Sequence, residues 1–373
     1  MTIFKPLAAD DKVSTKTLLH EAIPITGTIV SGTYSDSGNG SNIQNFTHGM
    51  FQSVYDYPYL SSSANHIFDI TFGTSADSAL AVADAAQPAK KDNIYNQMAQ
   101  VLMGYDKDGN IQRFDEDGNL ISTSEKIDDA IFMSFSRLLV KDEIKKGSFS
   151  MTVGTSASYS EDAAPGVFDE LITIADTGAS TSYRVNSPAG EYGILYATAS
   201  SGLLDTSSTH TASIGGNTYW RAGLIYYQAG VIALTSSMFM ASADGGYLIN
   251  GSCEWDGTAQ TLTGSLIGSE ITASADGLRT RIQNIQFNNT IELNSTVYFC
   301  RVKHNEFNYS SNPTYLSGSQ IRVKDNSTDI PISYITSIGL YSADNQLLAV
   351  GKFSEPIRKD SNIELTFRTR LDY

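Results

Sequence analysis

The segment YDKDGNIQRFDEDGNL (Tyr105–Leu120) contains the residues of this chain that come closest to a known ligand-binding motif. Three oxygen-bearing side chains occupy alternate positions like the first ligands of a calcium-binding EF-hand loop: Asp106, Asp108 and Asn110. That loop also needs glycine at its sixth position and a bidentate glutamate at its twelfth, but these positions hold Ile111 and Asp117. We therefore interpret the segment as two tight turns, one at each Asp-Gly step.

Histidine chemistry is the next candidate. The five histidines are His20, His48, His66, His210 and His304. A nucleophile elbow Gly-x-Ser-x-Gly is absent, as are the paired zinc histidines on a helix and the phosphate-binding glycine loops. His20-Glu21 begins like a zincin motif, but Pro24 occupies the position of the second histidine. The sequence predicts no catalytic residue, no cofactor and no metal ligand, and hence no enzyme.

Paired carboxylates and clustered tyrosines remain. The acidic pairs Glu161-Asp162 and Asp169-Glu170 suggest glycoside hydrolysis, which needs two facing carboxylates. Sequence neighbours on a strand point to opposite faces, so solvated loop charge is the better interpretation.

Tyr55, Tyr57 and Tyr59 could form a platform on which sugar rings stack. Aromatic side chains also dominate protein cores and interfaces, and a core or interface role is favoured for these three.

The composition indicates how such residues would be positioned. The 373 residues are 41% hydrophobic and only 17% charged, and 30 of them are glycine. Polar character comes from Ser, Thr, Asn and Gly, which is typical of short strands joined by many turns. We expect a mainly β fold with an α-helical segment, made of β-sandwich or open-barrel-like domains plus two helices and an extended N-terminal arm.

Three regions are predicted. Residues 1–75 form the strand-bearing N-terminal arm, residues 76–147 a helical segment with the Asp-Gly turns, and residues 148–373 a β-rich domain with a break near 255–275. The helices are expected from about Pro88 to Met103, with Gly104 at its C′ position, and from about Glu125 to Lys146. We expect the arm, about residues 1–45, to cross onto an adjacent subunit.

Charge and cysteine content restrict the partners. The net charge is −15, and residues 301–373 hold nine Lys/Arg against eight Asp/Glu, so the first 300 residues carry about −16. An acidic body repels phosphate, so we expect no nucleic-acid partner. Cys253 and Cys300 do not make a disulfide scaffold. No signal peptide or membrane helix is recognised, which predicts synthesis in a host cytoplasm and no membrane partner.

The end of the chain alternates between apolar and polar residues. Ile363, Leu365, Phe367, Thr369 and Leu371 fall on one face, and Glu364, Thr366, Arg368, Arg370 and Asp372 on the other. Period two predicts a half-buried strand, so we expect the chain to end inside its fold.

Five strings carry a resemblance to a known group of proteins: NEFNYSSNP (305–313), YITSIGLYSADNQLLAVGKFSEPI (334–357), RLDY (370–373), GLIYYQAGVIALT (223–235) and NFTHGMFQSVYDYPYLSSSANHIFDIT (45–71). They resemble virion structural proteins of contractile-tailed bacteriophages. The resemblance implies a virion component of the tail, baseplate or neck, present in several copies, whose partners are other virion proteins and copies of itself.

Three functions are weighed. The first is a non-enzymatic structural subunit of the tail or baseplate, with a neck or collar position as a variant. The second is a fibre-adaptor or host-receptor module that binds carbohydrate. The third is a virion polysaccharide hydrolase, which the failed motif search disfavours.

Overall fold

The computed structural model describes residues 4–31, 41–81, 86–120, 126–155, 168, 171–199, 202–242, 245–249, 268–310, 316–317, 320–321, 326 and 328–373. Strands dominate, so the predicted mainly β class is confirmed. The chain divides into two units, which we call unit 1 (Met1–Leu19 and Glu292–Tyr373) and unit 2 (His20–Ile291). Two long strands, β1 (Lys12–Thr26) and β14 (Ile282–Val302), contribute residues to both units.

This division differs from the three predicted regions. Residues 41–75, expected in the arm, are part of the sheet of unit 2, and the C-terminal break falls at residues 291 and 292, after the predicted 255–275. Residues 1–75 and 148–373 therefore each contribute to both units. The physical reason is strand pairing between residues far apart in the chain, which joins the N-terminal residues to β14.

Unit 2 is built on one antiparallel sheet, in the order β14-β7-β8-β10-β12-β13-β5-β4-β3-β2, with β6 beside β14, β9 beside β10 and β11 beside β12. Besides β14, the strands of this sheet are β2 (Ile43–Asn45), β3 (Gln52–Tyr55), β4 (His66–Thr74), β5 (Asp129–Phe135), β6 (Glu143–Ile144), β7 (Ser150–Gly154), β8 (Leu171–Ala175), β9 (Arg184–Ser187), β10 (Gly190–Ala199), β11 (Thr211–Ile214), β12 (Asn217–Tyr226) and β13 (Val231–Thr235). The helices are α1 (Gly27–Ser31), α2 (Pro88–Leu102), α3 (Arg137–Val140) and α4 (Ile271–Arg281). Short 3-10 turns are η1 (Ala9–Asp11), in unit 1, and η2 (Ala79–Ala81) and η3 (Ser236–Phe239), in unit 2.

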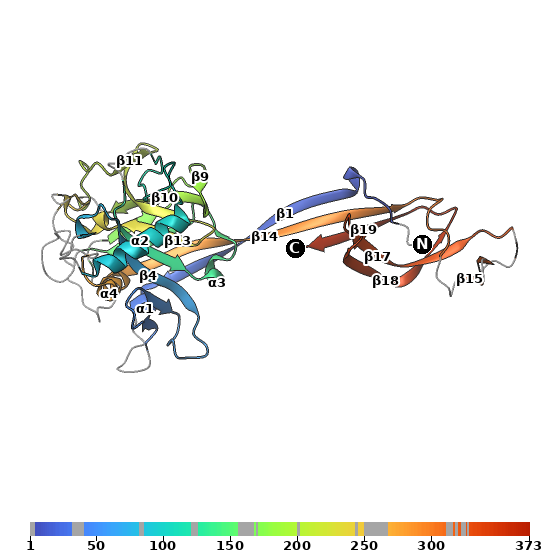
Figure 1. Ribbon diagram of the computed structural model, residues 1–373, viewed down its shortest axis with the longest axis horizontal. Helices are drawn as coiled ribbons and strands as arrows, with labels where there is room; N and C mark the ends of the chain where they lie inside the picture. Colours follow the sequence, from blue (N-terminus) through green and yellow to red (C-terminus); the bar gives the residue numbers. More distant parts are fainter. Residues whose placement is uncertain are drawn as a thin grey trace. The chain divides into compact units, whose positions relative to one another are not determined.

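The first predicted helix is confirmed as α2, which lies over the sheet beside β4 (Figure 1). Pro88 starts it, and Gly104, just beyond its end, has a φ of +80°. Gly73 on β4 lets the helix approach, because a Cβ there would lie 2.8 Å from the backbone nitrogen of Tyr95. Tyr95 then packs edge-on against Phe114, with 5.3 Å between ring centroids, inside the core.

The second predicted helix, Glu125–Lys146, is wrong. Its described residues contain β5, the short helix α3 and the strand β6. The apolar residues at 127, 131 and 135 are spaced by four, which fits one face of a helix and equally one face of a strand. Residues 130–133 are fully buried, because β5 lies between β13 and β4 and is covered on both faces. A second substantial helix does exist, α4, in a stretch for which no helix was predicted.

In unit 1, β14 pairs with β1 on one side and with β19 (Leu365–Asp372) on the other. The β14–β19 register runs antiparallel from Ser295 opposite Asp372 to Val302 opposite Leu365. The remaining strands are the short pair β15 (Leu316–Ser317) and β16 (Gln320–Ile321) and the hairpin β17 (Ile332–Tyr341) and β18 (Leu347–Asp360). The alternating terminal strand is confirmed, since its odd-numbered residues are half-buried and its even-numbered ones exposed.

Candidate assembly surface

The β17–β18 hairpin positions the most exposed apolar surface of unit 1. Its turn is closed by a hydrogen bond from the Ser342 amide to the Gln346 carbonyl (2.9 Å), and Asn345 takes a φ of +60°. Asparagine tolerates this left-handed conformation better than most residues, so the sequence favours a turn at this point. The turn fixes the register that sorts the hairpin side chains onto two faces.

The inner face of the hairpin packs within unit 1. Leu340 lies opposite Ala349, and Phe353 continues this face along β18. The Phe353 ring contacts the Phe367 ring of β19 at 4.8 Å between centroids. These side chains are only half-buried, so the hairpin and β19 form a thin apolar layer.

The outer face of the hairpin is apolar as well. Gly339 lies opposite Val350, and Tyr341 lies opposite Leu347. A Cβ on Gly339 would come within 2.8 Å of the Tyr341 ring and 3.2 Å of Leu347, so these groups share one face. The run Leu-Leu-Ala-Val (347–350) is therefore apolar on both faces of the strand. This pattern is typical of a strand whose two faces are both buried.

We define the hairpin patch as Phe4, Tyr341, Leu347, Leu348 and Val350. Their side chains are exposed by 47%, 39%, 54%, 63% and 60%, respectively. Phe4 joins the patch because its ring lies edge-on to that of Tyr341, at 4.7 Å. The described residues cover one side of the hairpin and, apart from the Phe4 ring, leave the other side exposed.

The two units differ in how they bury apolar side chains. The hydrophobic core, as far as the described residues define it, consists of unit 2 residues from Ile25 to Phe287. Unit 1 contributes 14 of the 23 exposed large apolar side chains of the described chain, although it holds only 101 of the 373 residues. Unit 1 is thus rich in apolar surface that its own fold does not cover.

The units also differ in charge. Unit 1 has 12 Lys/Arg against 11 Asp/Glu, and unit 2 has 13 against 29, which gives net charges of +1 and −16. Like-charged bodies repel each other, whereas a surface near neutrality favours association. Unit 1 therefore combines the two properties of an assembly surface.

The N-terminal segment is held within unit 1 by ion pairs to its own chain. Lys5 Nζ lies 2.6 Å from Glu306 Oε2, and this hydrogen bond, with the lysine charge, lowers the pKa of Glu306. Arg301 Nε lies 2.8 Å from Asp11 Oδ1. Within this chain, β1 pairs with β14, and the crossing of the arm onto an adjacent subunit stays a prediction.

The calcium-like loop is a turn. Asp106 Oδ1 accepts the backbone N–H groups of Asp108 (2.9 Å) and Asn110 (2.8 Å). These bonds lower the pKa of Asp106, that from Asn110 most strongly. Gly109 has a φ of +86°, and Tyr105 bridges to Ile111. The carboxylate thus satisfies the backbone of its own turn. Among the described residues, no three His, Cys, Asp or Glu side chains form a group that could hold a metal ion.

The histidines lie apart from one another in different contacts. His66 Nε2 lies 2.8 Å from Asp69 Oδ1, and the Ser53 hydroxyl donates to the same oxygen. Serine, histidine and aspartate thus do meet here, but the hydroxyl faces the carboxylate and not the imidazole that would have to deprotonate it. The other four histidines each have a different neighbour: His20 contacts Thr290, His48 contacts Phe46, His210 contacts Glu116 and His304 contacts Glu364.

The three tyrosines do not form a strand face. β3 ends at Tyr55, so Tyr57 and Tyr59 lie in the following loop. Tyr55 donates to Gln44 Oε1 (3.0 Å), its ring lies 6.3 Å from that of Tyr59, and Tyr57 is 54% exposed.

Cys300 is free and half-buried on β14, where burial and then the nearby Asp11 raise its pKa. Cys253 and the acidic pairs 161–162 and 169–170 lie outside the described residues.

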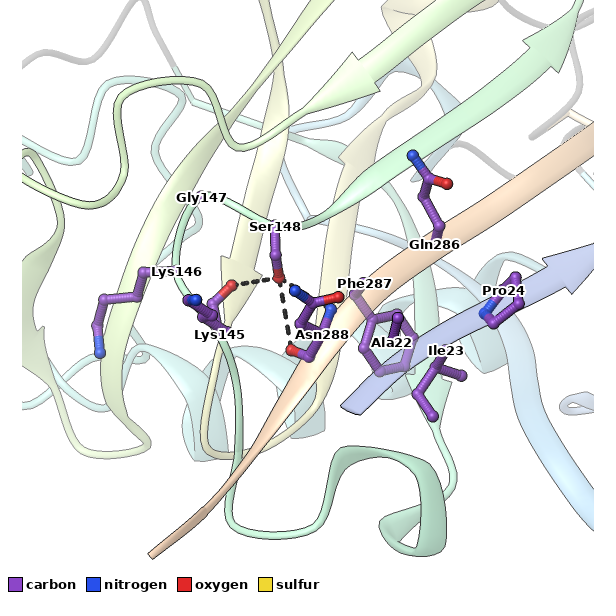
Figure 2. A pocket seen from close by; sticks show the side chains of 10 residues that line it. All are labelled: Ala22, Ile23, Pro24, Lys145, Lys146, Gly147, Ser148, Gln286, Phe287 and Asn288. Carbon is purple, nitrogen blue, oxygen red and sulfur yellow. Dashed lines mark hydrogen bonds between the residues drawn. The ribbon is translucent and has the colours of Figure 1, made fainter. Parts of the chain in front are cut away.

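A cavity of about 410 Å³ lies in unit 2 between β1, β14 and the β6–β7 connection (Figure 2). The Ser148 hydroxyl donates to the Lys145 carbonyl (2.6 Å) and accepts the Asn288 N–H (3.0 Å). Lys146 lies 2.6 Å from Glu191. Burial alone would lower the pKa of Lys146, but its two neighbouring carboxylates raise it. Ser148 and Lys146 of this cavity therefore bind other groups of the protein itself.

Comparison with protein-family models, with curated proteins and with solved structures finds no match. In the described part of the chain, no helix has the length and apolar character needed to span a membrane.

Proposed function

We propose that this protein is a non-enzymatic structural subunit that assembles into the tail or baseplate of a contractile-tailed bacteriophage. The observation that carries the proposal is the second apolar face of the β17–β18 hairpin, which the chain leaves exposed. Exposed apolar surface on a strand marks a contact with another protein. The virion setting rests on the resemblance of the five quoted strings, one of which includes this hairpin.

Three polar groups that were candidates for chemistry bind groups of the protein itself. The hydroxyls of Ser53 and Ser148 and the carboxylate of Asp106 are hydrogen-bonded to groups of their own fold. A neck or collar position within the particle would use the same surface. The acidic pairs considered for the hydrolase hypothesis lie outside the described residues.

Carbohydrate binding is the second candidate function. One observation favours it: Tyr57 is 54% exposed beside the Tyr55–Tyr59 ring pair, and aromatic faces suit sugar rings. Saturable glycan binding that Tyr57→Ala abolishes would support this function in addition to assembly. A glycan screen with no binding would remove it.

Mass spectrometry of purified particles, split into head and tail fractions, tests the main proposal. We expect the chain in the tail fraction at several copies per particle. Its absence from both fractions would contradict the proposal.

A further inference from the structure

We infer that the hairpin patch binds the hairpin patch of a second copy of this chain, forming a two-fold symmetric dimer. This inference deepens the proposed assembly role, on which it rests for its biological meaning, by naming the partner and the residues. Three properties of unit 1 carry it: the area of the patch, the charge of the unit and the arrangement of two charges at the ends of the patch.

The area suits a protein interface. A fully exposed aromatic side chain offers roughly 200 Å². The five patch residues, exposed by between 39% and 63%, then offer roughly 400–500 Å² of surface. The largest apolar patch of a typical monomer covers roughly 300–600 Å² and often marks a binding site, and the hairpin patch falls in this range. The patch supplies about half of the ~800 Å² that each partner contributes to a standard interface, and polar residues around it would have to supply the rest.

Charge favours a second copy as the partner. The patch itself contains no charged side chain, and unit 1 carries only +1. Two copies of unit 1 therefore meet with little repulsion, whereas two copies of unit 2, at −16 each, repel strongly. A strongly basic partner would be drawn to unit 2 and not to this patch.

The two ends of the patch carry opposite charges. Asp344 lies in the hairpin turn, and Lys352 lies on the outer face, opposite Ser337 and two residues beyond Val350. Both residues are exposed, and neither takes part in an ion pair among the described residues. When two hairpins meet antiparallel about a two-fold axis, Asp344 of each copy faces Lys352 of the partner subunit. A two-fold contact must be self-complementary in this way.

The first experiment measures the mass of the full chain in solution by light scattering over a range of concentrations. We expect about twice the chain mass of 40.3 kDa for the wild type. Val350→Glu buries a carboxylate in each half of the interface and should weaken dimerisation at least tenfold. The matched control is Val101→Glu on α2, since Val101 is 65% exposed and Val350 60%, and it should leave the dimer intact.

A charge exchange tests the arrangement. Asp344→Lys and Lys352→Asp should each weaken the dimer, because each places like charges together, and the double variant should restore it. A wild type that is monomeric throughout, a mass other than that of a dimer, an unchanged Val350→Glu dimer or a double variant as weak as the singles would overturn the inference. A dimer that forms as expected while the chain is missing from particles would count against the proposed function and leave this inference standing.

Discussion

The ring of Phe4 lies edge-on to the ring of Tyr341, with 4.7 Å between centroids and 72° between planes. The contact joins the first described residue to the end of β17. It places the N-terminal segment beside the hairpin patch within one chain, where the sequence predicted an arm that reaches a neighbour. The contact also makes Phe4 part of the surface through which we propose that two copies meet.

Phe4→Ala should loosen the N-terminal segment without unfolding the chain. An edge-to-face aromatic pair contributes about 0.5–1.5 kcal/mol, so amide exchange in residues 4–19 should accelerate several-fold. Hydrogen exchange read by mass spectrometry measures this. Tyr57→Ala, which removes a comparably exposed ring from unit 2, should leave these residues unchanged. Equal exchange in wild type and Phe4→Ala would show that the ring contact does not hold the segment.

The Phe353–Phe367 pair should couple in a double-mutant cycle. Each single change to alanine removes half-buried area, and we expect a coupling energy of about 0.5–1.5 kcal/mol for the pair. Denaturant unfolding of the two single variants and the double variant measures it. In the core of unit 2, Phe114→Ala should cost about 3–5 kcal/mol, because Phe114 is fully buried. Additive losses for Phe353 and Phe367 would contradict the inner-face packing.

Gly73→Ala should destabilise unit 2 by about 1–3 kcal/mol. The new methyl group would lie 2.8–2.9 Å from the backbone of Tyr95, so α2 must move away from β4. Gly351→Ala on β18 is the control, since no atom lies within 4 Å of its Cβ position, and it should change stability by less than about 0.5 kcal/mol. Equal melting temperatures for Gly73→Ala and wild type would refute the close contact of helix and sheet.

Asp176 should make stability depend on pH. Burial raises its pKa to about 6 from 3.8, although its carboxylate accepts the N–H groups of Gly147 (2.6 Å) and Phe149 (3.0 Å). Because the folded state holds this proton more tightly than the unfolded state, its contribution is full below about pH 4 and is lost as the pH rises through about 6. The free energy of unfolding should fall by up to about 3 kcal/mol over this window.

Replacing the carboxyl tests this assignment. Asp176→Asn should reduce the fall between pH 4 and 6 in denaturant titrations, whereas the exposed Asp108→Asn should keep it. Part of the fall should remain in Asp176→Asn, because burial also raises the pKa of Asp129 to about 6. An identical slope in Asp176→Asn and wild type would assign the pH dependence to other groups.

Local patterns predicted part of the fold. The helix α2 follows from Pro88, its apolar spacing and Gly104, and β19 from strict alternation, because in both cases one periodicity fits and the other does not. The apolar spacing in segment 127–135 fits both a helix and a strand. Burial on both faces of β5 distinguishes the strand from the helix. Partners distant in the chain thus overrode the local signal.

The hairpin patch could be predicted only partly from the sequence. The run 347–350 lies within the string 334–357, which resembles virion structural proteins. Its four consecutive apolar residues indicate a strand that is covered on both faces. Which side the chain itself covers depends on the contact of Phe353 with Phe367, and no local pattern predicts that contact. The division into two units was missed because it depends on how β1 and β14 pair across most of the chain.

The most direct test of the account is quantitative mass spectrometry of head and tail fractions from particles made with wild-type, Val350→Glu or Val101→Glu protein. We predict wild type and Val101→Glu at equal copy number in the tail fraction, and loss of Val350→Glu from it. Absence of the wild-type chain from both fractions, or incorporation of Val350→Glu at the wild-type level, would contradict assembly through the hairpin patch.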